Sequence, residues 1–136
     1  MKCTGHGSKE PGGNSEYFGK LTMGMFNGSG KSLRTLNCFN RSDKKLLDLA
    51  INQTHDLNKK LTLKIGANDI RNGYATLYGK LQEKDLVAVP AGSVSKFDDS
   101  AKIYFRDALH QRVSKRLTFR NKYGDTIIVH YKLERI

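Results

Sequence analysis

Apolar and polar residues alternate with a period of two early in the chain. Between residues 17 and 26, every second side chain from Tyr17 to Met25 falls on one face, which is the signature of a β-strand. Residues 27–30 then supply asparagine and glycine, which accept the positive φ of a tight turn. Residues 31–39 continue as a returning strand. The pattern predicts a β-hairpin.

The next segment, residues 43–57, has helical spacing instead. Its apolar residues form one broad face: Leu46, Leu47, Leu49, Ala50, Ile51 and Leu57. Ser42 is suited to cap exposed backbone N–H groups, and Asp43 suits the positive end of the helix dipole. We therefore expect a helix over 43–57 that packs on the core.

Alternation returns after this predicted helix. Leu61, Leu63 and Ile65 alternate with polar residues over 60–65, and residues 74–81 alternate again beyond turn residues at 68–73. These two stretches predict a second hairpin. Residues 86–89 predict a short strand that ends at Pro90, because proline cannot donate to a sheet ladder. Residues 91–100 predict a loop.

Two patterns compete over residues 99–114. Residues 101–106 alternate like a strand, whereas Phe105, Ala108, Leu109 and Val113 recur at helical spacing after Asp98, a candidate cap. We favour a helix over 99–114. The chain then predicts a final hairpin, with strands at 117–120 and 126–134 around a turn at 121–125.

The predicted elements follow the order β-β-α-β-β-(β)-α-β-β. Antiparallel hairpins with two interspersed helices predict an α+β fold, with the helices on one face of a sheet of about six or seven strands. Residues 1–15 hold four glycines and almost no apolar side chain. We expect them to form a flexible leader before one domain of residues 16–136.

Composition places the chain among basic globular proteins, with 136 residues, 38% of them hydrophobic, and a formal net charge of +11. No apolar run approaches the roughly 20 residues that span a bilayer, and no signal-peptide pattern follows Lys2. We therefore expect a soluble protein without a membrane partner, not secreted by a cleaved signal. Cys3 and Cys38 lack CxxC spacing, which predicts free thiols, no zinc site and an intracellular location, cytoplasmic or nucleoid-associated.

Positive charge is densest in the C-terminal segment. Residues 101–136 carry nine basic and three acidic side chains, a net +6, with five aromatic residues interleaved. Cations bind phosphates and aromatic rings stack on bases, so this combination favours a nucleic-acid partner. An acidic protein partner and solubility alone are the alternatives.

The predicted interface joins this segment to tyrosines on an alternating strand. We expect bases to stack on the tyrosines and phosphates to bind the C-terminal cations, with single strands preferred because no recognition-helix motif occurs. The predicted binding residues are Lys64, Tyr74, Tyr78, Lys80, Lys102, Arg106, Arg112, Lys115, Arg116, Arg120 and Lys122.

Nucleotide and metal chemistry are disfavoured. Gly30, Lys31 and Ser32 match the end of a GxxxxGK[ST] loop, but its first glycine falls at Met25 and a strand follows in place of the required helix. Asp98 and Asp99 are adjacent, which suits a helix cap better than a two-metal site. We expect neither a cofactor nor a metal.

Two alternatives to a non-enzymatic nucleic-acid-binding protein stay open. His130 and Glu134 share one face of the last predicted strand, and His110 would approach from the predicted helix, as in a small metal-independent ribonuclease or toxin-like enzyme. Structural histidines are the favoured interpretation. The other alternative is an oligomeric binding or coat protein, viral or plasmid-borne, whose strand edges pair between subunits.

Overall fold

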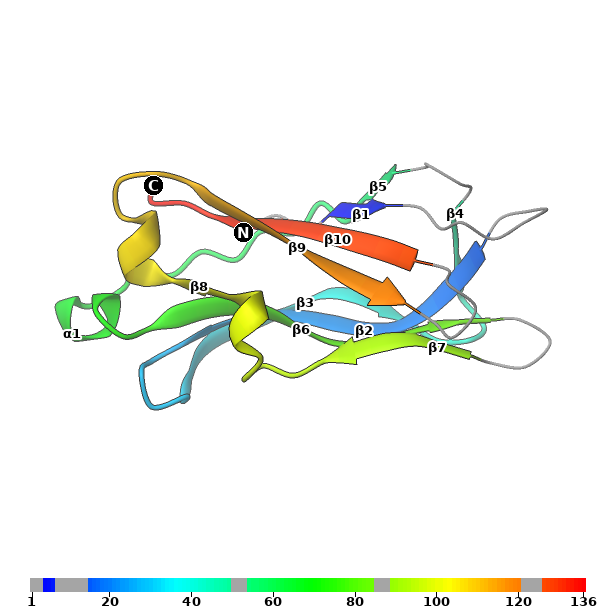
Figure 1. The fold of residues 1–136 in the computed structure, drawn as a ribbon, viewed down its shortest axis with the longest axis horizontal. Helices are drawn as coiled ribbons and strands as arrows, with labels where there is room; N and C mark the ends of the chain where they lie inside the picture. The colour runs from blue at the N-terminus through cyan, green and yellow to red at the C-terminus, as the bar shows by residue number, and fades with distance from the viewer. Residues whose placement is uncertain (1–3, 7–14, 50–53, 85–88, 121–125) are drawn as a thin grey trace.

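Two antiparallel sheets packed face to face form the described part of the protein, one above the other in Figure 1. The computed structural model describes residues 4–6, 15–49, 54–84, 89–120 and 126–136. All strand pairings among these residues are antiparallel. The predicted antiparallel pairing of strands is therefore confirmed, but the strands form two sheets and not the single predicted one.

The smaller sheet, sheet A, has four strands in the order β5-β1-β10-β9. Its strands are β1 (Thr4–His6), β5 (Thr54–Asp56), β9 (Val113–Arg120) and β10 (Thr126–Leu133). The final hairpin predicted from the sequence corresponds to β9 and β10, which pair over their whole length. Its predicted turn at 121–125 lies outside the described residues.

The larger sheet, sheet B, has six strands, with the order β3-β2-β6-β7 and with β4 beside β2 and β8 beside β6. Its strands are β2 (Ser15–Phe26), β3 (Ser32–Arg41), β4 (Leu47–Leu49), β6 (Tyr74–Glu83), β7 (Val89–Val94) and β8 (Lys102–Tyr104). The predicted first hairpin is confirmed as β2 and β3. Asn27 closes its turn, because its Oδ1 accepts hydrogen bonds from the backbone N–H groups of Ser29 and Lys31.

The hydrophobic core lies between the sheets. Alternate residues of β2 and β6 point inward from sheet B, and alternate residues of β9 and β10 meet them from sheet A. The most deeply buried include Leu21, Met23, Ala75, Leu77, Leu81, Phe119, Val129 and Tyr131. Burial of apolar area stabilises by about 25 cal/mol per Å². This burial therefore determines which face of each strand turns inward. The alternate residues of β2 and β6 then lie on the outer face of sheet B.

The helix predicted over 43–57 is wrong. Residues 47–49 form β4, which pairs with residues 15–17 of β2, and residues 54–56 form β5, whereas residues 50–53 of the predicted helix lie outside the described residues. Ser42 does accept a hydrogen bond from the backbone N–H of Lys44, but it closes a turn and not a helix. Leu47 and Leu49 are buried on either side of exposed Asp48, so tertiary pairing with β2 overrides the helical spacing.

The helix predicted over 99–114 is also wrong. Asp98 caps, as expected, but the capped element is the single 3₁₀ turn η1 (Asp99–Ala101). The chain then forms β8 on the edge of β6, a second 3₁₀ turn η2 (Phe105–Ala108), and β9. Among the described residues the one α-helix is α1 (Ala67–Ile70), so two helices packed on a sheet are not found.

Two further predictions need correction. Residues 60–65 form no sheet ladder, so the predicted hairpin with 74–81 is wrong, although Leu61, Leu63 and Ile65 do alternate inward. The predicted strand at 74–81 is confirmed as β6, but it pairs with β2, β7 and β8. The short strand predicted to end at Pro90 instead continues through it, because β7 also includes residues 91–94 of the expected loop. Residues 86–88 of that predicted strand lie outside the described residues.

Residues 4–6 also depart from the expected leader. They form β1 between β10 and β5 in sheet A, where Thr4 lies opposite both His130 and Asp56.

Among the described helices, none has the length and apolarity that a membrane crossing requires.

Candidate nucleic-acid interface

The predicted binding residues do not share one surface. Tyr74, Tyr78, Lys80 and Lys102 belong to the outer face of sheet B. Arg116 and Arg120 are exposed on the outer face of sheet A, because they alternate with the inward-facing Leu117 and the buried Phe119. The two groups therefore lie on opposite sides of the sandwich.

The remaining predicted residues are scattered. Lys64 is exposed on the irregular 57–66 segment, and Arg112 is exposed in the loop before β9. Lys115 donates from its ammonium group to the Ser100 carbonyl oxygen at 3.2 Å, which ties β9 to η1. Arg106 lies at the β8 end of sheet B. Lys122 lies outside the described residues. The C-terminal basic segment is thus divided between several surfaces.

Two lysines that are far apart in the sequence meet on the outer face of sheet B. Lys20 of β2 is the direct register partner of Lys80 of β6, and both side chains are exposed. Directly opposed residues of an antiparallel pair place their side chains about 4.5–5.5 Å apart at Cβ. Neither lysine has an acidic partner in the part of the chain that the structure describes. The result is a compact, uncompensated double positive charge.

A repeated tetrapeptide builds this arrangement. Residues 18–21 read Phe-Gly-Lys-Leu and residues 78–81 read Tyr-Gly-Lys-Leu. Antiparallel pairing brings the repeats together about a local two-fold axis, with Gly19 opposite Leu81 and Leu21 opposite Gly79. Both glycines have positive φ, +126° and +138°, and a Cβ on either would overlap the carbonyl oxygen of the other repeat's lysine. Glycine is therefore required at both positions for the two lysines to meet.

A shallow depression of about 550 Å³ surrounds the lysine pair. Its walls also include Thr22, Thr35, Asn37 and Tyr78. The Thr22 hydroxyl donates to Asn37 Oδ1 at 3.2 Å, which holds the amide group in place beside the depression. Hydroxyl, amide and ammonium donors around a double positive charge are the groups that bind phosphate oxygens.

A row of aromatic rings continues from the depression along β6 to β8. The Phe26 ring centroid lies 6.0 Å from that of Tyr78 and 5.4 Å from that of Tyr74. The Tyr74 ring in turn meets Tyr104 at 6.2 Å, edge-on. Phe26 and Tyr74 are buried, whereas Tyr78 and Tyr104 are half-buried. Tyr74 was predicted to stack on bases, but its buried ring instead packs beneath the accessible ones. Tyr78 and Tyr104 are the tyrosines with accessible ring surface.

Cations accompany these rings. The Lys96 ammonium lies 5.6 Å from the Phe26 centroid and 4.9 Å from the Phe97 centroid, and Phe97 is 57% exposed. The Arg106 guanidinium lies 4.7 Å from the Tyr104 centroid. Such contacts hold positive charge beside aromatic surface at little cost in desolvation. The lysine pair, the aromatic rings and the cations beside them form one continuous strip on sheet B, which we call the β6 strip. It consists of Lys20, Lys80, Tyr78, Phe26, Tyr74, Tyr104, Lys96, Phe97 and Arg106.

Two pKa shifts accompany the strip. Burial raises the pKa of the Tyr78 hydroxyl above its ordinary value, because the tyrosinate would be poorly solvated there. The hydrogen bond to Asp99 raises the pKa of Lys102, whose ammonium lies 2.9 Å from the Asp99 carboxylate and 4.5 Å from the Tyr74 centroid. Lys102 is therefore already paired, unlike Lys20 and Lys80.

The histidine and the glutamate on the last strand of the alternative ribonuclease site share one face but lie far apart along it. His130 and Glu134 are four residues apart on β10 and its extension, about 13 Å along a strand, with Lys132 between them. Glu134 pairs with that lysine, at 3.6 Å. His110 is exposed in the loop after η2. Acid and base must each lie within hydrogen-bond reach of one substrate, which this strand spacing does not provide for His130 and Glu134.

Metal ligands do not gather either. Within the described residues, no three histidine, cysteine, aspartate or glutamate side chains are grouped so that they could hold a metal ion. Cys38 is free and buried, with its thiol directed at the Leu21 carbonyl oxygen.

Comparison with known proteins gives no relative: no protein-family model, no curated protein and no solved structure matches this chain.

Several residues of the β6 strip were not predicted from the sequence. Lys20, Phe26, Lys96, Phe97 and Tyr104 were missed because their neighbours come from other strands. The repeated aromatic-Gly-Lys-Leu sequence is the one signal that could have found the lysine pair. It marks two strands with a positive-φ glycine next to an outward-facing lysine.

Proposed function

We propose that this protein binds single-stranded nucleic acid along the β6 strip. The observation that carries the proposal is the Lys20–Lys80 pair: two exposed lysines directly opposite each other, without an acidic partner among the described residues. Like charges in this position destabilise an antiparallel pair of strands. A bound phosphate would relieve the repulsion, and the hydrogen-bonding groups of the depression would support it.

The half-buried rings next to the lysine pair support base stacking. Tyr78 borders the depression and Tyr104 lies beyond Tyr74 at the other end of the row. Phe26 and Tyr74 hold them in place from below, so little side-chain entropy is lost when a base stacks. Stacking on one aromatic ring contributes about 1–3 kcal/mol per base and tolerates any sequence.

A single strand suits this surface better than a duplex. The strip is a sheet face about 20 Å long from Lys80 to Tyr74, and rings lying on it reach only bases that are unstacked from a partner strand. The described residues offer no helix long enough to enter a major groove. Arg116 and Arg120, on the opposite face, would not touch a strand bound here.

Titration of purified protein, freed of carried-over nucleic acid, into labelled oligonucleotides tests the proposal. Single-stranded DNA, single-stranded RNA and duplex DNA of equal length are compared at two salt concentrations. We expect the single strands to bind more tightly than the duplex, remain intact, and lose affinity steeply with salt. Absence of binding at low salt would overturn the proposal, and shortening of the RNA would favour the ribonuclease alternative.

A further inference from the structure

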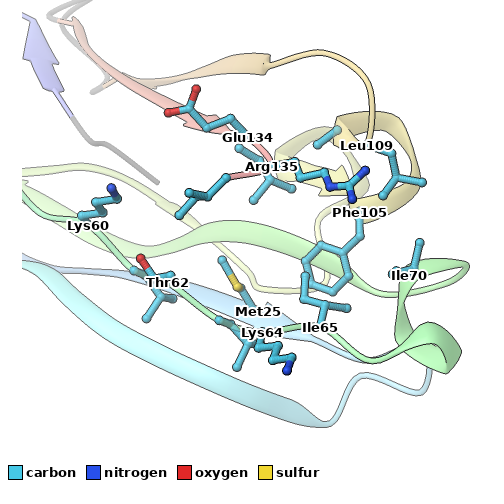
Figure 2. Close-up of a pocket in the computed structure, with 15 residues that line it drawn as sticks. Met25, Lys60, Thr62, Lys64, Ile65, Ile70, Phe105, Leu109, Glu134 and Arg135 are labelled. Carbon is cyan, nitrogen blue, oxygen red and sulfur yellow. The ribbon is translucent and has the colours of Figure 1, made fainter.

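A separate cavity opens between the two sheets at the end of the sandwich formed by η2, the end of β10 and the 60–65 segment (Figure 2). Its volume is about 740 Å³. Ten of its fifteen lining residues are apolar, and Figure 2 shows Met25, Ile65 and Phe105 projecting into it. Small-molecule sites commonly have volumes of about 300–1,000 Å³ and mainly apolar walls.

The 60–65 segment explains why this end of the core is open. The segment makes no sheet ladder, so backbone hydrogen bonds do not hold it along its length beside a neighbouring strand. It is held at its middle, where an Arg34 guanidinium nitrogen donates to the Thr62 carbonyl oxygen at 2.6 Å. Leu61 is buried, whereas Leu63 and Ile65 are only half-buried and face the cavity. Apolar surface that the two sheets would otherwise cover stays accessible.

Charge at the rim of the cavity is predominantly positive. Lys60, Lys64 and Arg135 line it, against one acidic residue, Glu134. The Glu134 carboxylate pairs with Lys132 and points away from the cavity in Figure 2. Arg135 extends toward η2, and it has no acidic partner in the described part of the chain. An anionic group at this rim would meet uncompensated cations.

We propose that the cavity binds a fatty-acid-like amphiphile, an alkyl chain that ends in a carboxylate. The alkyl chain of the ligand lies against Met25, Leu63 and Phe105, and its carboxylate accepts hydrogen bonds from the Arg135 guanidinium. A guanidinium holds a carboxylate through two parallel hydrogen bonds, which a neutral or cationic head group cannot accept in the same way. This site is independent of the β6 strip, which lies on the outer face of sheet B.

Calorimetric titration with three ten-carbon probes tests the site: decanoate, decanol and decyltrimethylammonium, each below its micelle concentration. We expect decanoate to bind with one-to-one stoichiometry and more tightly than the other two. Arg135→Gln should weaken decanoate binding about tenfold, the effect of losing one charge-assisted hydrogen-bonded contact, and leave decanol binding unchanged. Arg120→Gln removes the same charge from the outer face of sheet A and should have no effect.

Filling the cavity gives a second test. Leu109 is half-buried in the wall, so Leu109→Trp is expected to fold, as judged by circular dichroism, and to abolish decanoate binding. The proposal of an anionic ligand would be overturned if all three probes bound with equal affinity. It would also be overturned if the Arg135→Gln and parent proteins bound decanoate equally well. Absence of decanoate binding to the parent protein would overturn the site itself.

Discussion

Lys20 and Lys80 lie directly opposite each other on β2 and β6, each preceded by a positive-φ glycine that fits over the other lysine's carbonyl oxygen. The arrangement costs stability twice. Like charges are opposed across a strand pair, and each glycine adds conformational entropy to the unfolded chain. A costly feature built symmetrically from two repeats is more consistent with a binding role than with a structural one.

Removal of one lysine should stabilise the fold. Lys80→Gln relieves the repulsion across the strand pair and should raise the free energy of unfolding by about 0.2–1 kcal/mol in low salt. The gain should shrink in 1 M salt, because screening already weakens the repulsion in the parent protein. Urea denaturation measures both values. Lys64→Gln, at an exposed lysine off the sheets, serves as the control. A lower stability for Lys80→Gln would show that Lys80 has a structural role.

Gly79 should resist substitution strongly. Gly79→Ala places a Cβ against the Lys20 carbonyl oxygen at a φ of +138°, so a loss of roughly 1–3 kcal/mol or more in the free energy of unfolding is expected. Gly66→Ala is the matched control, because a Cβ there meets no atom within 4 Å and its φ of −73° suits alanine. Thermal or urea unfolding compares the two. Similar stabilities would mean that β2 and β6 do not cross as closely as described.

Tyr78 should contribute ring surface and not its hydroxyl group. Tyr78→Ala is expected to weaken binding of single-stranded oligonucleotides by about 1–3 kcal/mol, whereas Tyr78→Phe should retain most of the affinity. Fluorescence anisotropy at constant salt measures both. Equal weakening by the two substitutions would assign the effect to the hydroxyl group, and an unchanged affinity of Tyr78→Ala would remove base stacking at this position.

The raised pKa of Tyr78 gives the fold a pH dependence on the alkaline side. The unfolded chain releases the tyrosine proton at lower pH than the folded protein does. The contribution of Tyr78 to stability is therefore complete below its unfolded pKa, about 10, and is lost as the pH rises through the folded value. Unfolding experiments between pH 8 and pH 11.5 should show a steeper loss for the parent protein than for Tyr78→Phe. If the stability of the two proteins fell in parallel with rising pH, the raised pKa of Tyr78 would be contradicted.

Period-two patterning predicted the parts of the fold that are local. The β2–β3 and β9–β10 hairpins join strands that are adjacent in sequence, and the turn between β2 and β3 carries the required asparagine and glycine residues. The strand at 74–81 was also predicted, because Ala75, Leu77 and Leu81 alternate with polar and aromatic residues.

The failures come from contacts between distant segments. Leu47 and Leu49 fit a helix and a strand equally well over so short a stretch, and pairing with residues 15–17 decides between them. Phe105 and Ala108 do lie on one helical turn, but β8 pairs with β6 immediately before it and stops the helix from forming earlier. The same limit applies to the β6 strip. Lys80 and Tyr78 were identified on their own strand, but Lys20 becomes their neighbour only through the β2–β6 pairing.

Two charge-matched double variants test the proposed interface most directly. Lys20→Gln with Lys80→Gln, and Arg116→Gln with Arg120→Gln, each remove two positive charges, from sheet B and sheet A respectively. Affinity for a single-stranded oligonucleotide is measured over a range of salt concentrations. We expect the sheet B variant to bind more weakly and to lose about 0.7 from the slope of log affinity against log salt for each phosphate contact removed. The sheet A variant should resemble the parent protein. If both variants lose affinity equally, net charge alone governs binding and the β6 strip is not the interface.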